Sequence, residues 1–154
     1  MVSKLGKKKI FEDLKVARNV LQQEAAGIIK LAEILDHNFI KALDIMSSTN
    51  GRVIISGMGK SGHIANKMAA TLASTGTPAQ YVNAAEASHG DMGMVTKHDV
   101  LIAISNSGET LELTNLVAHA KINTIPLISI TGRVNSTLDK AGDVSLVLPE
   151  LQEA

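Results

Sequence analysis

From residue 52 onward, short apolar runs alternate with segments that have helical periodicity. The runs are almost uninterrupted, as in Val100-Leu101-Ile102-Ala103-Ile104, which is typical of strands buried on both faces. We expect strands at residues 53–56, 80–82, 100–105, 127–130 and 144–148, and helices at residues 61–74, 110–120 and 135–140. The alternation predicts an α/β fold, a doubly wound five-stranded parallel sheet flanked by helices. Ligands of such sheets bind at the carboxyl ends of the strands, near the topological switch point. The expected binding end therefore consists of residues 56–62, 83–93, 105–110 and 131–135.

The first 50 residues have a pattern typical of helices. Leu14, Leu21, Ile28 and Leu35 recur every seven residues and form an apolar stripe on one helical face. Asp36-His37-Asn38 interrupts the stripe and can cap a second helix. We therefore expect N-terminal helices in residues 1–50 and a sheet domain in residues 51–154. The stripe can pack either on its own domain or on another subunit. Its heptad spacing suits the second case, and we expect a homo-oligomer, either a dimer or a tetramer.

The composition excludes several classes of function. The chain has 15 basic and 15 acidic residues, one tyrosine, two phenylalanines and no tryptophan, so we expect no nucleic-acid partner. We expect no membrane partner, because its apolar runs are too short to span a bilayer. The residues after Lys7-Lys8-Lys9 do not form the apolar core of a signal peptide. Cysteine is absent, which excludes disulfides and thiolate metal sites and fits the cytoplasm. The histidines lack metal-ligand spacing, and we expect neither a metal nor a cofactor.

A hydroxyl-rich segment, Ser105-Asn106-Ser107-Gly108-Glu109-Thr110, lies between an expected strand and an expected helix. It brings three hydroxyls, an amide and a glycine to a helix N-terminus, where backbone N–H groups have no partner within the helix. Such a turn can bind phosphate without a cationic side chain. Each serine by itself also fits ordinary turn or cap chemistry. Their density within six residues favours a phosphate site.

A glycine-rich loop, Gly57-Met58-Gly59-Lys60-Ser61-Gly62, follows the first expected strand. It matches the G-x-G-x-x-G pattern of dinucleotide sites, but the acidic residue expected after the second strand is missing. The end of the loop also resembles a P-loop, yet that pattern requires glycine where this chain has Ile54. The remaining interpretation is a tight turn in which Gly59 lets the backbone approach a ligand and Lys60 points into the crevice. The alternative is a turn in which Ser61 only caps the helix.

Three motifs together resemble one family: residues 57–62, residues 87–91 (Ala-Ser-His-Gly-Asp) and residues 105–110. Similar stretches occur at residues 73–78, 89–95 and 104–109. The set is similar to the sugar isomerase (SIS) domain, and most of all to that of the arabinose-5-phosphate isomerases, over about residues 51–154. The resemblance implies an aldose–ketose isomerase that interconverts D-arabinose 5-phosphate and D-ribulose 5-phosphate through a cis-enediol. It also implies a role in making Kdo, the acidic sugar of lipopolysaccharide or capsule in Gram-negative bacteria.

The resemblance further implies the residues of the site. The phosphate- and sugar-binding group contains donors from the two loops: Gly59, Ser61, Ser105, Asn106, Ser107 and Thr110. The catalytic group contains acid–base and electrostatic residues: Lys60, His89, Glu112 and Glu153. Lys60 would stabilise the enediolate oxygen, and Glu153 is the favoured base, with Glu112 as the other candidate. His89 would assist ring opening or contact the sugar. Glutamates are often only solvated, His89 can bond within its own loop, and Glu109 is expected to be structural.

The chain departs from the family pattern in one respect. That pattern continues with a Thr- and Ser-rich helix, a His-Pro-Gly-Gly motif with a further active-site histidine and often two CBS modules, which these 154 residues do not contain. We therefore expect the C-terminal end of the SIS domain to be missing and turnover by this chain to be weak or absent. The alternative function is a non-catalytic SIS module that senses a phosphosugar. It needs the phosphate turn but not Lys60, His89 or Glu153, and residues 1–50 lack a basic DNA-recognition helix.

Overall fold

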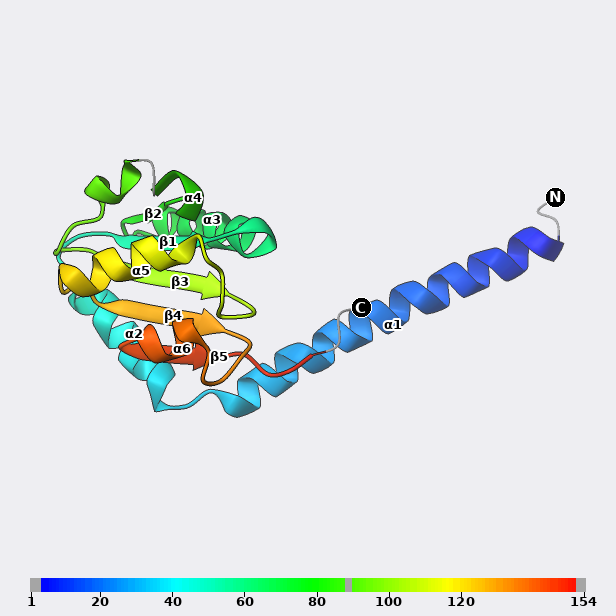
Figure 1. Ribbon diagram of the computed structural model, residues 1–154. Coiled ribbons are helices and arrows are strands. Elements are labelled where there is room, and N and C mark those ends of the chain that lie inside the picture. Colours follow the sequence, from blue (N-terminus) through cyan, green and yellow to red (C-terminus); the bar gives the residue numbers. More distant parts are fainter. Residues whose placement is uncertain (1–3, 88–89, 152–154) are drawn as a thin grey trace. The chain divides into compact units, whose positions relative to one another are not determined.

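The computed structural model describes residues 4–87 and 90–151, which belong to two units (Figure 1). The first unit comprises residues 1–35 and 149–154, and the second comprises residues 36–148. The sheet lies entirely within the second unit. Among the helices of the described residues, none combines the length and the apolar character needed to cross a membrane.

The first unit contains the long helix α1 (Lys4–Ile34). Its 31 residues span roughly 46 Å at about 1.5 Å per residue. Leu14, Leu21 and Ile28 of the predicted stripe are 50%, 65% and 69% exposed. At a different position on α1, a Cβ added to Gly27 would lie 2.7 Å from Cδ1 of Leu151, so the segment after residue 148 packs closely there. That the stripe packs on its own domain or on another subunit remains a prediction.

The second unit begins with Asp36 and α2 (His37–Ser48). Asp36 caps this helix, because its Oδ1 accepts a hydrogen bond from the backbone N–H of Asn38 at 2.8 Å. The predicted break between two N-terminal helices is therefore confirmed. Ala42 of α2 is buried in a cluster that includes Ile55 of the first strand, so the second helix packs on the sheet.

Five strands form a single sheet in which every neighbouring pair is parallel. They are β1 (Val53–Gly57), β2 (Ala79–Tyr81), β3 (Val100–Ser105), β4 (Leu127–Thr131) and β5 (Val144–Val147). The strand order is β2-β1-β3-β4-β5, which confirms the predicted α/β class, and each strand matches its predicted range to within one residue. Because β2 and β3 lie on opposite sides of β1, the topological switch point falls between β1 and β3.

Helices cover both faces of the sheet, as predicted for a doubly wound fold (Figure 1). On one face, α2 and α3 (Gly59–Ser74) pack on a cluster to which Ile55 contributes. On the other, α4 (Ala84–Ala87), α5 (Leu113–Ile122) and α6 (Thr137–Ala141) pack on a cluster that contains Ile54. Successive strand residues thus serve opposite faces, which explains why the strands are continuous apolar runs.

The connections differ from the sequence prediction in two places. The β2–β3 connection contains α4 and the 3-10 helix η1 (Asp91–Met94), and each of these four-residue helices is too short to show a helical period. The helix expected to start at residue 110 begins only at Leu113. A tight turn precedes it, in which the N–H of Leu113 donates to the carbonyl of Thr110 at 3.2 Å. The predicted start of this helix is therefore wrong.

Candidate active site

Sheet pairing brings the glycine-rich loop and the hydroxyl-rich turn to the same edge. Gly57 at the end of β1 is the parallel partner of Ile104 near the end of β3. Neighbouring strands lie about 4.8 Å apart, so the chain leaves both strands at one level. Residues 58–62 and 105–110 therefore flank the switch point, where ligands of doubly wound sheets bind.

Two glycines of the first loop allow β1 and α3 to approach closely. A Cβ on Gly62 would lie 2.8 Å from the carbonyl oxygen of Gly57 and 3.0 Å from the hydroxyl of Tyr81. The Tyr81 hydroxyl in turn donates to the Gly57 carbonyl at 3.4 Å. These contacts fix the entry of the chain into α3 and leave little room for any other residue at position 62.

The start of α3 carries three of the predicted site residues. Gly59 has a φ of +54°, and its Cβ position faces open space, so a ligand can approach the backbone there. Lys60 is exposed and Ser61 is half-buried, both in the first turn of this 16-residue helix. The partial positive charge of a helix N-terminus favours an anionic ligand at this position.

The hydroxyls of the second loop converge. The Oγ of Ser105 lies 2.6 Å from the Oγ1 of Thr110 and 3.4 Å from the Oγ of Ser107. Ser105 is 2% exposed and its Oγ accepts a hydrogen bond from the N–H of Gly108 at 3.0 Å, whereas Ser107 is exposed. Asn106, which lies between the two serines in the sequence, is exposed, and its side-chain oxygen lies close to Gly132. This arrangement offers several donors to one anion, and phosphate binding there remains a prediction.

The hydroxyl-rich turn packs against Ser136, at the end of the β4–α6 connection, and against Thr137, the first residue of α6. Gly108 has a φ of +67°, and a Cβ at that position would collide with the side chain of Ser136. The carboxylate of Glu109 accepts hydrogen bonds from both the N–H and the hydroxyl of Thr137. Sequence reasoning expected a structural role for Glu109 but did not identify Thr137, because the two residues are 28 positions apart.

The structure places only part of the predicted catalytic group. Glu112 is exposed and immediately precedes α5, two residues beyond Thr110. His89 and Glu153 lie outside the described residues. Sheet topology thus brings the first turn of α3, with Lys60, beside the hydroxyl-rich turn, while the proton-transfer roles stay predictions.

A pocket of about 270 Å³ adjoins the hydroxyl-rich turn. The turn and Leu111, which follows it, form one wall, and residues of α5 and α6, among them Val117 and Leu138, form the others. No motif in the sequence indicated this pocket, because its walls come from three separate elements.

The sheet and its loops define a class of protein: a doubly wound α/β domain with strand order 2-1-3-4-5 and a hydroxyl-rich turn at its switch point. The SIS domain model matches residues 45–154, and the chain belongs to the SIS domain family. This finding confirms the resemblance seen in the sequence motifs.

Similar chains are found among bacterial enzymes. The chain is 47% identical over 144 residues to the arabinose 5-phosphate isomerase KdsD of Shigella flexneri, a match that covers 94% of this chain and 44% of the relative. It is 48% identical over 138 residues to KdsD of Pseudomonas aeruginosa, covering 90% of this chain and 42% of the relative. The chain therefore spans less than half the length of these relatives.

A solved structure extends the comparison to three dimensions. The Escherichia coli CFT073 protein c3406, solved in complex with arabinose 5-phosphate, aligns with a TM-score of 0.86 and 37% identity. The alignment covers 92% of this chain and 75% of that protein. The fold of this chain is therefore shared with a SIS-type structure that holds a ligand.

Proposed function

We propose that this chain is the SIS part of a sugar-phosphate isomerase that interconverts D-arabinose 5-phosphate and D-ribulose 5-phosphate. The observation that carries the proposal is the pairing of Gly57 with Ile104, which sets the Lys60 loop beside the hydroxyl-rich turn. It is supported by 47% identity to an arabinose 5-phosphate isomerase over 94% of the chain. This support favours an isomerase over a non-catalytic phosphosugar sensor.

The two loops divide the work of holding the substrate. The phosphate dianion would accept hydrogen bonds from Ser61, in the first turn of α3, and from Ser107 and Thr110 in the turn that precedes α5. The Ser105 hydroxyl is buried and would act mainly by orienting Thr110, 2.6 Å away. Backbone groups of Gly59 and Asn106 would complete the cradle. The sugar then extends from the phosphate toward Lys60.

The chemistry is a proton transfer between neighbouring carbons. In the open-chain aldose, a base removes the proton from C2, and the electron pair forms the C1–C2 double bond while the carbonyl oxygen becomes an enediolate. Lys60 would stabilise that oxygen. Return of the carbon-bound proton to C1, with transfer of the O2 proton to O1, turns the C2–O2 bond into a carbonyl and gives the ketose. We assign the base to Glu153, with Glu112 as the second candidate, and assign ring opening or sugar contact to His89.

The test measures deuterium incorporation at C2 of D-arabinose 5-phosphate in heavy water by NMR, together with ligand affinity by calorimetry. We expect slow exchange with this chain. Replacement Lys60→Met should lower it by about a hundredfold, as for loss of one oxyanion donor. Lys67→Met, on an exposed position of the same helix, should leave it unchanged. Binding without exchange would favour the sensor, and absence of both would contradict the proposal.

The biological setting follows from the proposed reaction. We propose that the product supplies Kdo synthesis for lipopolysaccharide or capsule, and that the protein acts in the cytoplasm. We also propose a homo-oligomer, a dimer or a tetramer, because the stripe on α1 leaves Leu21 and Ile28 more than 60% exposed. Sugar phosphate is the small-molecule partner, without a metal or another cofactor.

A further inference from the structure

Backbone hydrogen bonds tie the hydroxyl-rich turn at two points to the segment that runs from the end of β4 into α6. The N–H of Gly132 donates to the carbonyl of Asn106 at 3.0 Å, and the N–H of Leu138 donates to the carbonyl of Gly108 at 3.0 Å. These two bonds involve backbone only, so they depend weakly on side-chain identity. They bring the first turn of α6 against the turn that carries Ser107 and Thr110.

Side chains add a second tie between the same segments. Oε1 of Glu109 accepts a hydrogen bond from the N–H of Thr137 at 2.9 Å, and Oε2 accepts one from the Thr137 hydroxyl at 2.6 Å. Both carboxylate oxygens are therefore engaged by one residue. Such charge-assisted pairs are stronger and more directional than neutral hydrogen bonds.

The position of Glu109 raises an electrostatic problem for an anion site. A carboxylate between Ser107 and Thr110 repels an incoming dianion unless its charge is engaged elsewhere. The hydroxyl of Thr137 and then its N–H lower the pKa of Glu109, and the positive charges of Arg133 and Lys140 act in the same direction. The negative charge is thus held on the side of the turn that faces α6.

We propose that Glu109 and Thr137 form a latch that positions the substrate-binding turn, with neither residue touching the substrate. The latch keeps the Glu109 carboxylate turned away from the phosphate and holds Ser107 and Thr110 in their converged arrangement. The inference rests on the proposed function, since it assumes that this turn receives the phosphate of a sugar phosphate.

The test measures the affinity of the full chain for D-arabinose 5-phosphate by calorimetry. Thr137→Val keeps the shape of the side chain but removes the hydroxyl, and it should weaken binding by about tenfold. Thr137→Ser restores the hydroxyl and should return the affinity to within about twofold of the original. Thr71→Val, which removes an exposed hydroxyl on α3, is the matched control and should have no effect.

A double-mutant cycle separates the latch from general damage. Thr137→Val removes only the hydroxyl bond to Glu109, whereas Glu109→Ala removes both bonds. The double variant should therefore bind no more weakly than Glu109→Ala alone, because the carboxylate that the hydroxyl contacts is already gone. Thermal unfolding reports whether the variants remain folded. Unchanged affinity in folded Thr137→Val, or fully additive losses, would overturn the latch alone. Failure of the unmodified chain to bind the sugar phosphate would overturn the proposed function and the latch with it.

Discussion

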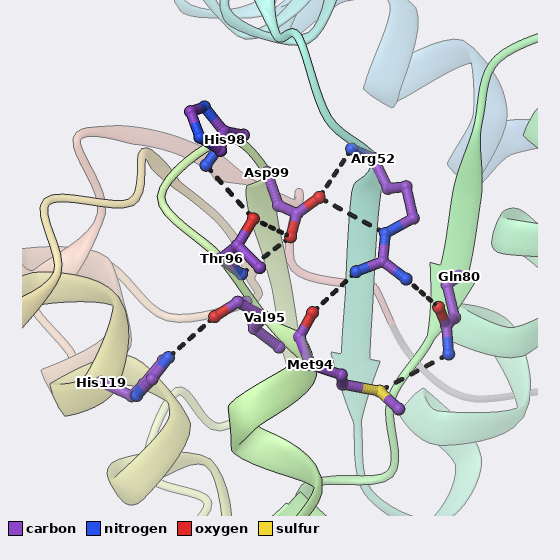
Figure 2. A network of polar contacts seen from close by, with 8 residues as sticks. All are labelled: Arg52, Gln80, Met94, Val95, Thr96, His98, Asp99 and His119. Atoms are coloured by element: carbon purple, nitrogen blue, oxygen red, sulfur yellow. Dashed lines mark hydrogen bonds and ion pairs between the residues drawn. The ribbon is translucent and has the colours of Figure 1, made fainter.

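Asp99 shows how one buried charge can be fully satisfied. It is 2% exposed, and its Oδ1 accepts a hydrogen bond from the backbone N–H of Arg52 at 2.7 Å. Its Oδ2 accepts from the N–H of Thr96 at 2.8 Å and from the Thr96 hydroxyl at 2.9 Å (Figure 2). Burial raises the pKa of Asp99, but the hydrogen bonds from Thr96 and Arg52 outweigh it, so the net pKa lies below its ordinary value.

Replacement Asp99→Asn should destabilise the fold by about 2–3 kcal/mol at pH 7, because an amide N–H would then face these donors. The folded pKa lies below the ordinary value of 3.8, so the stabilisation by the carboxylate is complete well above pH 3.8 and is lost as the pH falls through the folded pKa. Urea unfolding at pH 7 and pH 3 should show a smaller difference between the two proteins at the lower pH.

The control for this experiment is Asp44→Asn, at an exposed position of α2, which should change the free energy of unfolding by less than about 0.5 kcal/mol. A difference between the Asp99 proteins that is the same at both pH values would contradict the assignment.

Gly108 is required by both conformation and space. Its φ of +67° disfavours any side chain, and a Cβ would meet the Ser136 side chain and lie 2.9 Å from the Thr131 hydroxyl oxygen. Replacement Gly108→Ala should cost roughly 2–4 kcal/mol of folding free energy, the sum of left-handed strain and overpacking. Thermal unfolding measures the loss. Gly93→Ala, where a Cβ has no heavy atom within 4 Å, is the control and should unfold near the original temperature.

At the scale of elements, the Asp99 network secures the long β2–β3 connection. Arg52 also donates from Nη2 to the carbonyl of Met94 at 2.7 Å, at the end of η1. Nε2 of His119 on α5 lies 3.0 Å from the carbonyl oxygen of Val95, the next residue (Figure 2). The side chains of Arg52, just before β1, and of His119 on α5 thus hold a connection that has only two short helices of its own among its described residues.

Helix α1 presents a continuous apolar stripe, and its role in the proposed oligomer can be tested. Leu21→Asp places a charge at the middle of the stripe and should lower the molar mass measured by light scattering, because burying an unpaired carboxylate at an interface is costly. Gln22→Asp, one residue away and off the stripe, is the control and should leave the mass unchanged. An unchanged mass for Leu21→Asp would contradict an interface at this stripe.

At the scale of the whole molecule, the sequence predicted the sheet well, because buried parallel strands have a distinctive appearance. Runs such as residues 100–105 are apolar at nearly every position, and their burial on both faces is what requires this. Periodicity also identified α3 and the break at Asp36. It missed α4 and η1, because an element of four residues has no measurable period.

The site was predictable to the extent that it depends on local sequence. The motifs at residues 57–62 and 105–110 could be recognised in the sequence, and parallel pairing places them at the ends of adjacent strands. The contact between Glu109 and Thr137 could not be predicted from the sequence, because it depends on how the β4–α6 connection packs against the turn. The start of α5 was missed for a different, local reason, because a tight turn from Thr110 to Leu113 delays the helix.

The register of β1 and β3 also has a consequence for how such a domain can diversify. The pairing of Gly57 with Ile104 is made by backbone hydrogen bonds, which do not depend on the side chains in either loop. The distance between the two loops is therefore set by the sheet, while the chemistry of each loop can change independently. A change of loop residues toward those of another domain of the same topology should therefore alter ligand preference without altering the scaffold, as long as Gly62, Gly108 and the Glu109–Thr137 contact are kept.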